Sequence, residues 1–146
     1  MWYEIKNDED AMEFMSRMGF FHDSCIKEMK YYSGAFVNED LSMHPTNDCR
    51  TLSVIIQRQF PEKPMVEMQF SGLRHLRLSP LDTTFTCEIL DSTLLWKDSC
   101  VYWCDCGGLP ITDLENYEGT MVCASGLRWR SIDGYMGQNE FYASVT

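Results

Sequence analysis

Long apolar runs are missing from the sequence, and so is the basic and then apolar start that marks an exported protein. The first residues turn acidic instead. We therefore expect a cytoplasmic location and no membrane association. The length of 146 residues is typical of one domain and is sufficient to bury a core, so a single domain over residues 1–146 is expected.

Basic residues are scarce, with 12 lysines and arginines against 22 aspartates and glutamates and a formal net charge of −10. This balance disfavours binding to nucleic-acid backbones and to anionic membranes, because both require a basic surface. It is compatible with solubility alone, and it also favours a basic protein as a partner. Loops carry binding residues more often than the strands they join. The candidate contacts are therefore carboxylates of the expected turns, namely Glu39, Asp40, Asp48, Glu62, Asp113, Glu115 and Glu118.

The common catalytic and cofactor motifs are absent as well. The sequence has no Gly-x-Ser-x-Gly elbow, no phosphate-binding loop, no dinucleotide fingerprint and no Cys-x-x-Cys pair. Its seven cysteines are an odd number, which favours free thiols over a disulfide framework in a cytoplasmic protein. Cys104 and Cys106 share one face of a predicted strand, but two ligands do not make a metal site. We therefore expect no cofactor and no bound metal.

An amphipathic helix is predicted over residues 8–18. Asn7 or Asp8 can serve as the N-cap, acidic residues occupy the first turn, and Gly19 ends the helix. The apolar residues form one stripe, which suits a helix packed on a sheet and also an adaptable binding face. The residues of this stripe are Ala11, Met12, Phe14, Met15 and Met18.

After Phe21 the apolar period changes to two, which is typical of half-buried antiparallel strands. Turn formers at Gly34, at residues 44–48 and at residues 61–64 separate the segments by distances that suit hairpins. Those distances are too short for helical crossovers. The alternating positions are Val37, Leu41 and Met43 in one segment, and Leu52, Val54 and Ile56 in the next.

Further strands are predicted over residues 65–79, 83–89, 100–106 and 121–132, with another short one around Leu94 and Trp96. Gly72 interrupts the first of these, and a glycine there marks a bulge or bend that curls a sheet toward a barrel. The spacing Thr112-x-x-Glu115 predicts a capping box for a short helix. The fold class is therefore α+β, with a predominantly antiparallel sheet of about six to eight strands, curved or barrel-like, and one N-terminal helix.

The Ser-Gly-Leu-Arg sequence at residues 71–74 recurs at residues 125–128, either by duplication or by chance. The two copies concentrate basic charge in an acidic chain. If their strands are neighbours, their arginines form a basic patch that suits an anion or a partner. The alternative is that each arginine pairs with a glutamate across the sheet. These residues are Arg74, Arg77, Arg128 and Arg130.

The tripeptide His22-Asp23-Ser24 is the most enzyme-like stretch of the chain. Neighbouring side chains of an extended strand point to opposite faces, so these three residues cannot form a proton relay among themselves. No catalytic residue is therefore assigned. His22 and Asp23 remain candidates for binding a ligand or partner.

The sequence Phe-His-Asp-Ser at residues 21–24 follows the predicted helix and precedes the predicted hairpins. In this sequence and layout, the chain resembles a group of small bacterial proteins of unknown function. It is also loosely similar to small immunity proteins that neutralise a partner toxin. The first resemblance implies no activity and no site residues, whereas the second implies a stoichiometric protein partner.

The acidic composition and the missing motifs favour a non-catalytic protein-binding module of the immunity or inhibitor kind. Two alternatives stay open. One is a small-ligand-binding β-barrel with aromatic residues such as Trp96 and Trp103 at its mouth. The other is an enzyme that uses His22 as a base with a distant partner. The sequence leaves the oligomeric state open.

Overall fold

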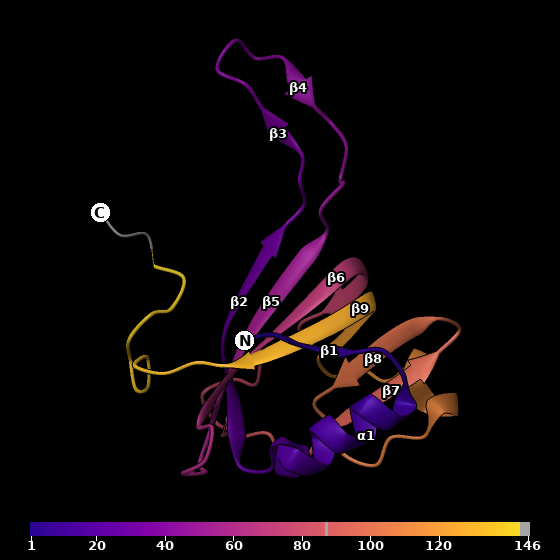
Figure 1. Cartoon of the computed structure of the whole chain (residues 1–146), viewed down its shortest axis with the longest axis vertical. Coiled ribbons are helices and arrows are strands. Elements are labelled where there is room, and N and C mark those ends of the chain that lie inside the picture. Colours follow the sequence, from indigo (N-terminus) through magenta and orange to yellow (C-terminus); the bar gives the residue numbers. More distant parts are fainter. Residues whose placement is uncertain (87, 144–146) are drawn as a thin grey trace.

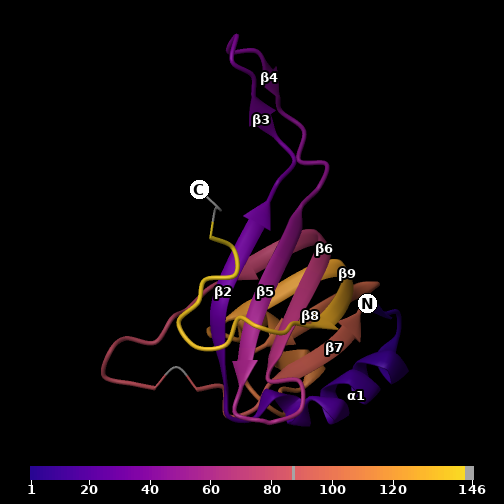
Figure 2. The same ribbon diagram turned by 60° about the vertical axis from the view of Figure 1, so that its left-hand side comes forward.

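A computed structural model describes residues 1–86 and 88–143. As predicted, the protein is an α+β fold built on an antiparallel sheet, here of seven strands, with one N-terminal α-helix; a small two-stranded sheet is present in addition (Figures 1 and 2). The strand order is β2-β5-β6-β9-β8-β7, and β1 also pairs with β9. The strands of this sheet are β1 (Tyr3–Ile5), β2 (Ser24–Tyr32), β5 (Thr51–Arg58), β6 (Met65–Arg77), β7 (Thr93–Lys97), β8 (Cys100–Cys104) and β9 (Met121–Ser131).

The long strands β6 and β9 form the centre of the sheet, and their pairing shifts register between Leu73 and His75. One edge of β9 is shared, because β8 pairs with its first residues and β1 with residues further along. The register shift beside Gly72 agrees with the predicted bend. The sheet is curved but not closed, and β2 and β7 are the two ends of its strand order.

Helix α1 (Asp8–Arg17) packs against the curved sheet, and Asn7 caps its first turn by accepting a 2.9 Å hydrogen bond from the Asp10 backbone nitrogen. Phe14 stacks on Trp129 of β9, with ring centroids 4.9 Å apart. The predicted stripe is wrong at Met12, which is 61% exposed. Successive helical residues differ by about 100° in direction, so a residue next to the centre of the stripe can turn away from the sheet. The other four members of the stripe, Ala11, Phe14, Met15 and Met18, are buried.

The main core lies between α1 and the face of the sheet that carries Val54, Val66 and Trp103. The opposite face is covered in two places. A 3₁₀ helix, η2 (Ile111–Asn116), places Leu114 against Cys104. At the other end of that face, residues 141–142 lie against a second cluster around Met65. Strand β8 is therefore covered on both faces.

One predicted strand and one predicted helix cap are wrong, whereas the short helix itself is present as η2. The described residues of the segment 83–89 form no strand: Ile89 makes only an isolated bridge with Ser24, and Phe85 is 65% exposed. Cys87 of that segment lies outside the described residues. The capping box at Thr112 is also absent, because Pro110 occupies the N-cap position of η2 and no side chain caps this helix. No helix in the described part of the chain is both long and apolar enough to cross a membrane.

Candidate functional site

A hairpin projects from one end of the sheet where β2 and β5 continue past their neighbours (Figures 1 and 2). We call residues 33–50 the arm. It contains β3 (Phe36–Val37) and β4 (Met43–His44), which pair only with each other. The turn between them is closed at Asn38, whose backbone nitrogen donates to the Ser42 carbonyl at 2.8 Å. The hairpin turn therefore lies within residues 38–42, whereas the predicted turn formers at Gly34 and residues 44–48 lie at the base and along the returning side of the arm.

Large apolar side chains of the arm are exposed to solvent. The prediction that Val37, Leu41 and Met43 are half-buried is wrong, because their exposed fractions are 54%, 82% and 64%. Phe36, which the alternation did not single out, is 52% exposed and stacks on His44 with a centroid distance of 5.0 Å. The alternation predicted a strand with one covered face, but no other strand in the described part of the chain pairs with β3 or β4. Periodicity alone does not say whether that cover comes from the same chain.

The base of the arm depends on a glycine. Gly34 is buried and has a φ of 97°, a conformation that favours glycine. A Cβ atom at this position would lie 2.8 Å from the backbone nitrogen of Cys49 and closer still to the Asp48 carboxylate. The two sides of the arm therefore lie close together at Gly34. Ser33 accepts hydrogen bonds at its carbonyl from the backbone nitrogens of Cys49 and Arg50, at 3.0 and 3.1 Å.

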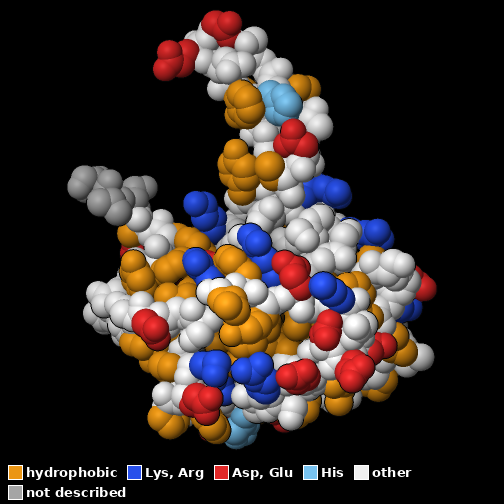
Figure 3. Space-filling model, viewed as in Figure 1, with side chains coloured by type: hydrophobic (Ala, Val, Ile, Leu, Met, Phe, Trp, Pro, Cys, Tyr) orange, Lys and Arg blue, Asp and Glu red, His pale blue; other side chains and the backbone are white. Residues whose placement is uncertain are grey.

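The tip and one side of the arm carry negative charge. Glu39 and Asp40 lie in the hairpin turn, and Figure 3 shows acidic side chains at the end of the arm with apolar ones below them. The Asp48 carboxylate forms a 3.0 Å hydrogen bond with His44 Nε2, and this hydrogen bond lowers the pKa of the Asp48 carboxyl. The four other predicted carboxylates lie elsewhere: Glu62 in the β5–β6 turn, and Asp113, Glu115 and Glu118 in or next to η2. The seven carboxylates therefore do not form one surface.

His22 lies at the exposed end of the short helix η1 (Gly19–Phe21). Its Nδ1 hydrogen bonds to the Leu90 carbonyl, and its Nε2 lies 3.4 Å from the Asp23 carboxylate. The first of these contacts and then the second raise the pKa of His22. The Ser24 hydroxyl donates to the backbone carbonyl of His22 at 3.4 Å, so it does not contact the imidazole. The tripeptide therefore forms no nucleophile and base pair.

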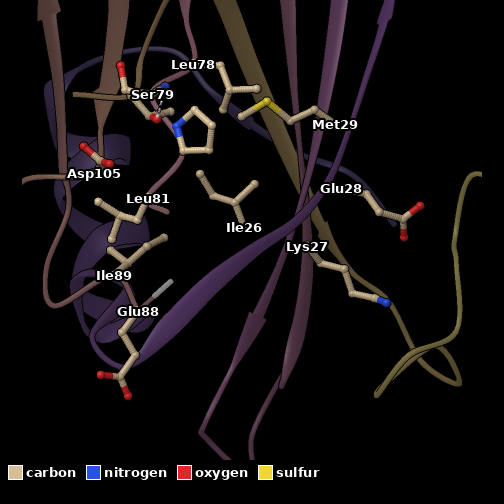
Figure 4. Close-up of a pocket in the computed structure, with 12 residues that line it drawn as sticks. Ile26, Lys27, Glu28, Met29, Leu78, Ser79, Leu81, Glu88, Ile89 and Asp105 are labelled. Carbon is tan, nitrogen blue, oxygen red and sulfur yellow. Dashed lines mark hydrogen bonds between the residues drawn. The ribbon is translucent and has the colours of Figure 1, made fainter. Parts of the chain in front are cut away.

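A pocket of about 390 Å³ lies between β2 and the segment that follows β6. We call it the seam pocket because it lies beside the edge strand β2. Figure 4 shows the Ile26, Leu81 and Ile89 side chains pointing toward one another inside it, while Lys27 and Glu28 point away. None of the tryptophans lines this pocket. The remaining lining residues are Met29, Leu78, Ser79, Pro80, Glu88, Asp105 and Thr120.

The two Ser-Gly-Leu-Arg copies lie side by side on β6 and β9, with Ser71 directly opposite Gly126. The strands are antiparallel, so the arginines of the two copies lie toward opposite ends of the pair. Arg128 is opposite Gln69, which is five residues or about 17 Å along β6 from Arg74. A single patch of four arginines therefore does not form.

The four arginines have different partners. Arg130 Nε pairs with the Glu67 carboxylate of the neighbouring strand at 2.9 Å, which is the cross-sheet pairing weighed above. Arg128 Nε donates to Gln69 Oε1 at 2.7 Å. At the other end of the strands, Arg77 donates to the backbone carbonyl of Tyr117. Arg74 is exposed.

The described cysteines form no disulfide. The Cys104 thiol is buried, which raises its pKa, and it donates to the Cys106 carbonyl at 3.4 Å. Over residues 1–86 and 88–143, no group of three or more histidine, cysteine or acidic side chains is placed to hold a metal ion. The local chemistry of Cys104 is therefore that of a packed thiol.

Comparison of the chain with protein-family models, with curated proteins and with solved structures found no match. The functional argument therefore depends on the residues and geometry described above.

Proposed function

We propose that this protein is a non-catalytic binding module whose arm contacts a basic protein partner in a stoichiometric complex. The observation that carries this proposal is the projecting hairpin with four large apolar side chains, each more than half exposed. Soluble monomers rarely leave large contiguous apolar surfaces uncovered, and such surfaces mark sites of interaction. A partner that covers the arm would bury these four apolar side chains.

The chemistry of the arm favours a basic partner over an acidic or neutral one. The arm has three carboxylates, Glu39, Asp40 and Asp48, against one arginine, Arg50, within a chain of net charge −10. The acidic side chains at the tip of the arm steer a basic partner toward it, and the exposed apolar side chains next to the tip become buried in the complex. This is also the kind of surface that an inhibitor of a basic enzyme requires, in keeping with the resemblance to immunity proteins.

The test uses the purified full chain as bait in an extract of its native host, followed by reconstitution of the captured protein at defined ratios. Bait that carries Phe36→Thr, Val37→Thr and Met43→Thr lacks three of the four exposed apolar side chains of the arm. Threonine is used because it keeps the preference for a strand. We expect the unaltered bait to recover a basic protein that forms a defined-ratio complex. The arm variant should lose that protein while keeping its melting temperature.

The matched control is Met12→Gln, which removes an exposed apolar side chain on α1. This variant should capture the partner as well as the unaltered protein does. Equal capture by the arm variant, or no basic partner at low salt, overturns the proposal. An unaltered protein that dimerises through the arm, shown by a dimer that becomes a monomer in the arm variant, assigns the arm to self-association and also overturns it.

The seam pocket supports a second candidate function, the binding of a small apolar ligand. Its volume of about 390 Å³ falls within the usual range for ligand sites, and apolar side chains line it. A fluorescent apolar probe tests this role. Leu78→Gln and Leu81→Gln should weaken probe binding, whereas Leu90→Gln should not, because Leu90 is exposed outside the pocket lining. Equal effects of all three variants contradict a ligand role for this pocket.

A further inference from the structure

A second pocket lies on the face of the sheet opposite α1, at the base of the arm. Its volume is about 480 Å³. We call it the outer-face pocket. Its floor comes from four adjacent strands, β2, β5, β6 and β9, and its walls come from residues near the two chain ends. The lining residues are Trp2, Lys30, Tyr32, Cys49, Thr51, Ser53, Glu67, Gln69, Arg130, Phe141 and Tyr142.

The strand register explains why these polar side chains share one face. Lys30 is opposite Ser53 on β5, and Ser53 is opposite Gln69 on β6. In the next row, Glu67 is opposite Arg130 on β9. Side chains of directly opposed residues point to the same face of a sheet, so these rows form a continuous polar floor. The buried apolar residues between them face α1 instead.

The Glu67 carboxylate in the floor of the pocket already has hydrogen-bond partners within the protein. Glu67 is only 3% exposed and accepts from Arg130 Nε at 2.9 Å and from the Tyr142 hydroxyl at 2.8 Å. Beside the pocket, Glu28 accepts from the backbone nitrogens of Phe141 and Tyr142 at 2.7 and 3.2 Å. These bonds hold residues 141–142 against the sheet and so fix one wall. The site is therefore built by specific polar contacts.

The remaining charge of the lining is positive. Lys30 and Arg130 stand against the single carboxylate of Glu67, and that carboxylate is paired with Arg130. In the described part of the chain, no ion pair joins Lys30 to a carboxylate. Figure 3 shows lysine and arginine side chains gathered around the base of the arm. In a chain of net charge −10, the pocket lining therefore has two cations and one carboxylate, and the Glu28 carboxylate beside it is bonded to backbone nitrogens.

The aromatic side chains that line the pocket differ in their contacts with cations and with other rings. The Trp2 ring lies against Arg130, 4.6 Å from its guanidinium carbon, and the Lys30 ammonium lies 5.8 Å from the centre of the Tyr142 ring. Tyr32 lines the same pocket and is 56% exposed. Over the described residues, neither a ring nor a cation stacks on Tyr32. Its π face is available to a ligand.

We propose that the outer-face pocket binds a small anion that carries a planar aromatic ring, either a mononucleotide or an aryl carboxylate. The anionic group pairs with the Lys30 ammonium, and the ring stacks on Tyr32. Alternate residues of a strand share a face and lie about 7 Å apart, so the Lys30 and Tyr32 side chains can both reach one small ligand. Stacking of a base on an aromatic side chain contributes about 1–3 kcal/mol. This proposal is independent of the partner assigned to the arm.

Isothermal titration calorimetry with four probes tests the proposal. Adenosine monophosphate and indole-3-acetate combine a ring with an anionic group, whereas adenosine lacks the anion and inorganic phosphate lacks the ring. We expect at least one of the first two to bind, with affinity at least tenfold tighter than adenosine and phosphate. Binding of the monophosphate alone identifies the ligand as a nucleotide, and binding of the carboxylate alone identifies it as an aryl acid. Either result supports the site.

Matched variants on one strand separate the pocket from the rest of the surface. Tyr32→Leu and Lys30→Gln should each weaken binding about tenfold or more, because they remove the stacking face and the cation. Tyr31→Leu and Lys27→Gln are the controls, since both residues lie on β2 outside the pocket lining. Absence of binding by both adenosine monophosphate and indole-3-acetate overturns the proposal. Phosphate or adenosine binding as tight as that of the tighter of these two probes, or equal losses in the control variants, also overturns it.

Discussion

Arg58 Nη2 donates a 3.0 Å hydrogen bond to the backbone carbonyl of Met18, the C-cap residue of α1. The Nη1 atom of the same side chain donates to the carbonyls of Glu62 and Lys63 at 3.0 and 2.9 Å. Arg58 is only 4% exposed and is the last residue of β5. One buried guanidinium therefore joins the end of the helix to the β5–β6 turn.

Replacing Arg58 should destabilise the whole domain. Arg58→Met keeps a long side chain but leaves three carbonyl groups without their donor, and a loss of about 2 kcal/mol or more in the free energy of unfolding is expected. Urea denaturation measures this loss. Arg74→Met is the control, because Arg74 is exposed. Equal stability of the two variants would show that Arg58 does not stabilise the domain through these bonds.

The docking of α1 gives a second prediction. Met15 is 2% exposed within the main core, so Met15→Asp buries a charge and should lower the free energy of unfolding by about 3 kcal/mol or more. Met12→Asp places the same charge on the solvent side of the same helix and should change stability by less than about 1 kcal/mol. Circular dichroism and tryptophan fluorescence during denaturation provide the measurement. Loss of helix without loss of tertiary structure would contradict a docked helix.

The sequence correctly predicted the elements whose apolar side chains are buried against other parts of the same chain. Phe14 and Met15 of α1, and Val54 and Ile56 of β5, are buried on the predicted faces. Gly72 also predicted the bend of β6, because its φ of 60° and its contact with Ser125 favour a residue without a side chain. These predictions succeeded because the spacing of apolar residues and the position of a glycine both depend directly on the local backbone geometry.

The sequence could not predict features that depend on long-range pairing. Met43 is exposed because, among the described residues, β4 pairs with β3 alone and not with the main sheet, which its local alternation does not encode. The outer-face pocket joins Lys30 to Arg130, residues 100 positions apart in the sequence, and no motif relates them. The sequence left open whether the strands of the two Ser-Gly-Leu-Arg copies are neighbours, and the structure shows that they are. Only the antiparallel register shows that Arg74 and Arg128 point to different ends.

The pH dependence of stability should carry a contribution from His22. The hydrogen bond to the Leu90 carbonyl, and then the Asp23 carboxylate, raise the pKa of His22 above its ordinary value of 6.5. A group whose pKa is higher in the folded state stabilises the protein while it is protonated. That contribution is fully present below the ordinary value and is lost as the pH rises through the higher folded pKa.

Two measurements check this expectation. A titration followed by NMR should give a pKa for His22 above its ordinary value, and Asp23→Asn should lower it. The stability difference between the unaltered protein and His22→Gln should be larger at about pH 5.5 than at about pH 8.5. A difference that grows with rising pH has the wrong sign and would exclude the proposed contacts as the cause.

The last prediction concerns the negative tip of the arm, and it requires the partner identified by the capture experiment. Glu39 is the suitable residue to change, because Asp40 accepts a 2.9 Å hydrogen bond from the Ser42 backbone nitrogen and so also holds the turn. Glu39→Lys should slow association several-fold at low salt, since a charge at the rim of an interface acts mainly on the rate of encounter. The melting temperature should remain nearly unchanged.

Glu118→Lys is the control for the tip, because it changes the net charge equally but lies just after η2, away from the arm. Its effect on the association rate should be the smaller one, and rising ionic strength should reduce the difference between the two variants. Rates come from surface plasmon resonance or stopped-flow mixing at several salt concentrations. If both variants slow association equally, the overall charge and not the tip steers the partner. An association rate that ignores salt would mean that the acidic residues of the arm serve solubility alone.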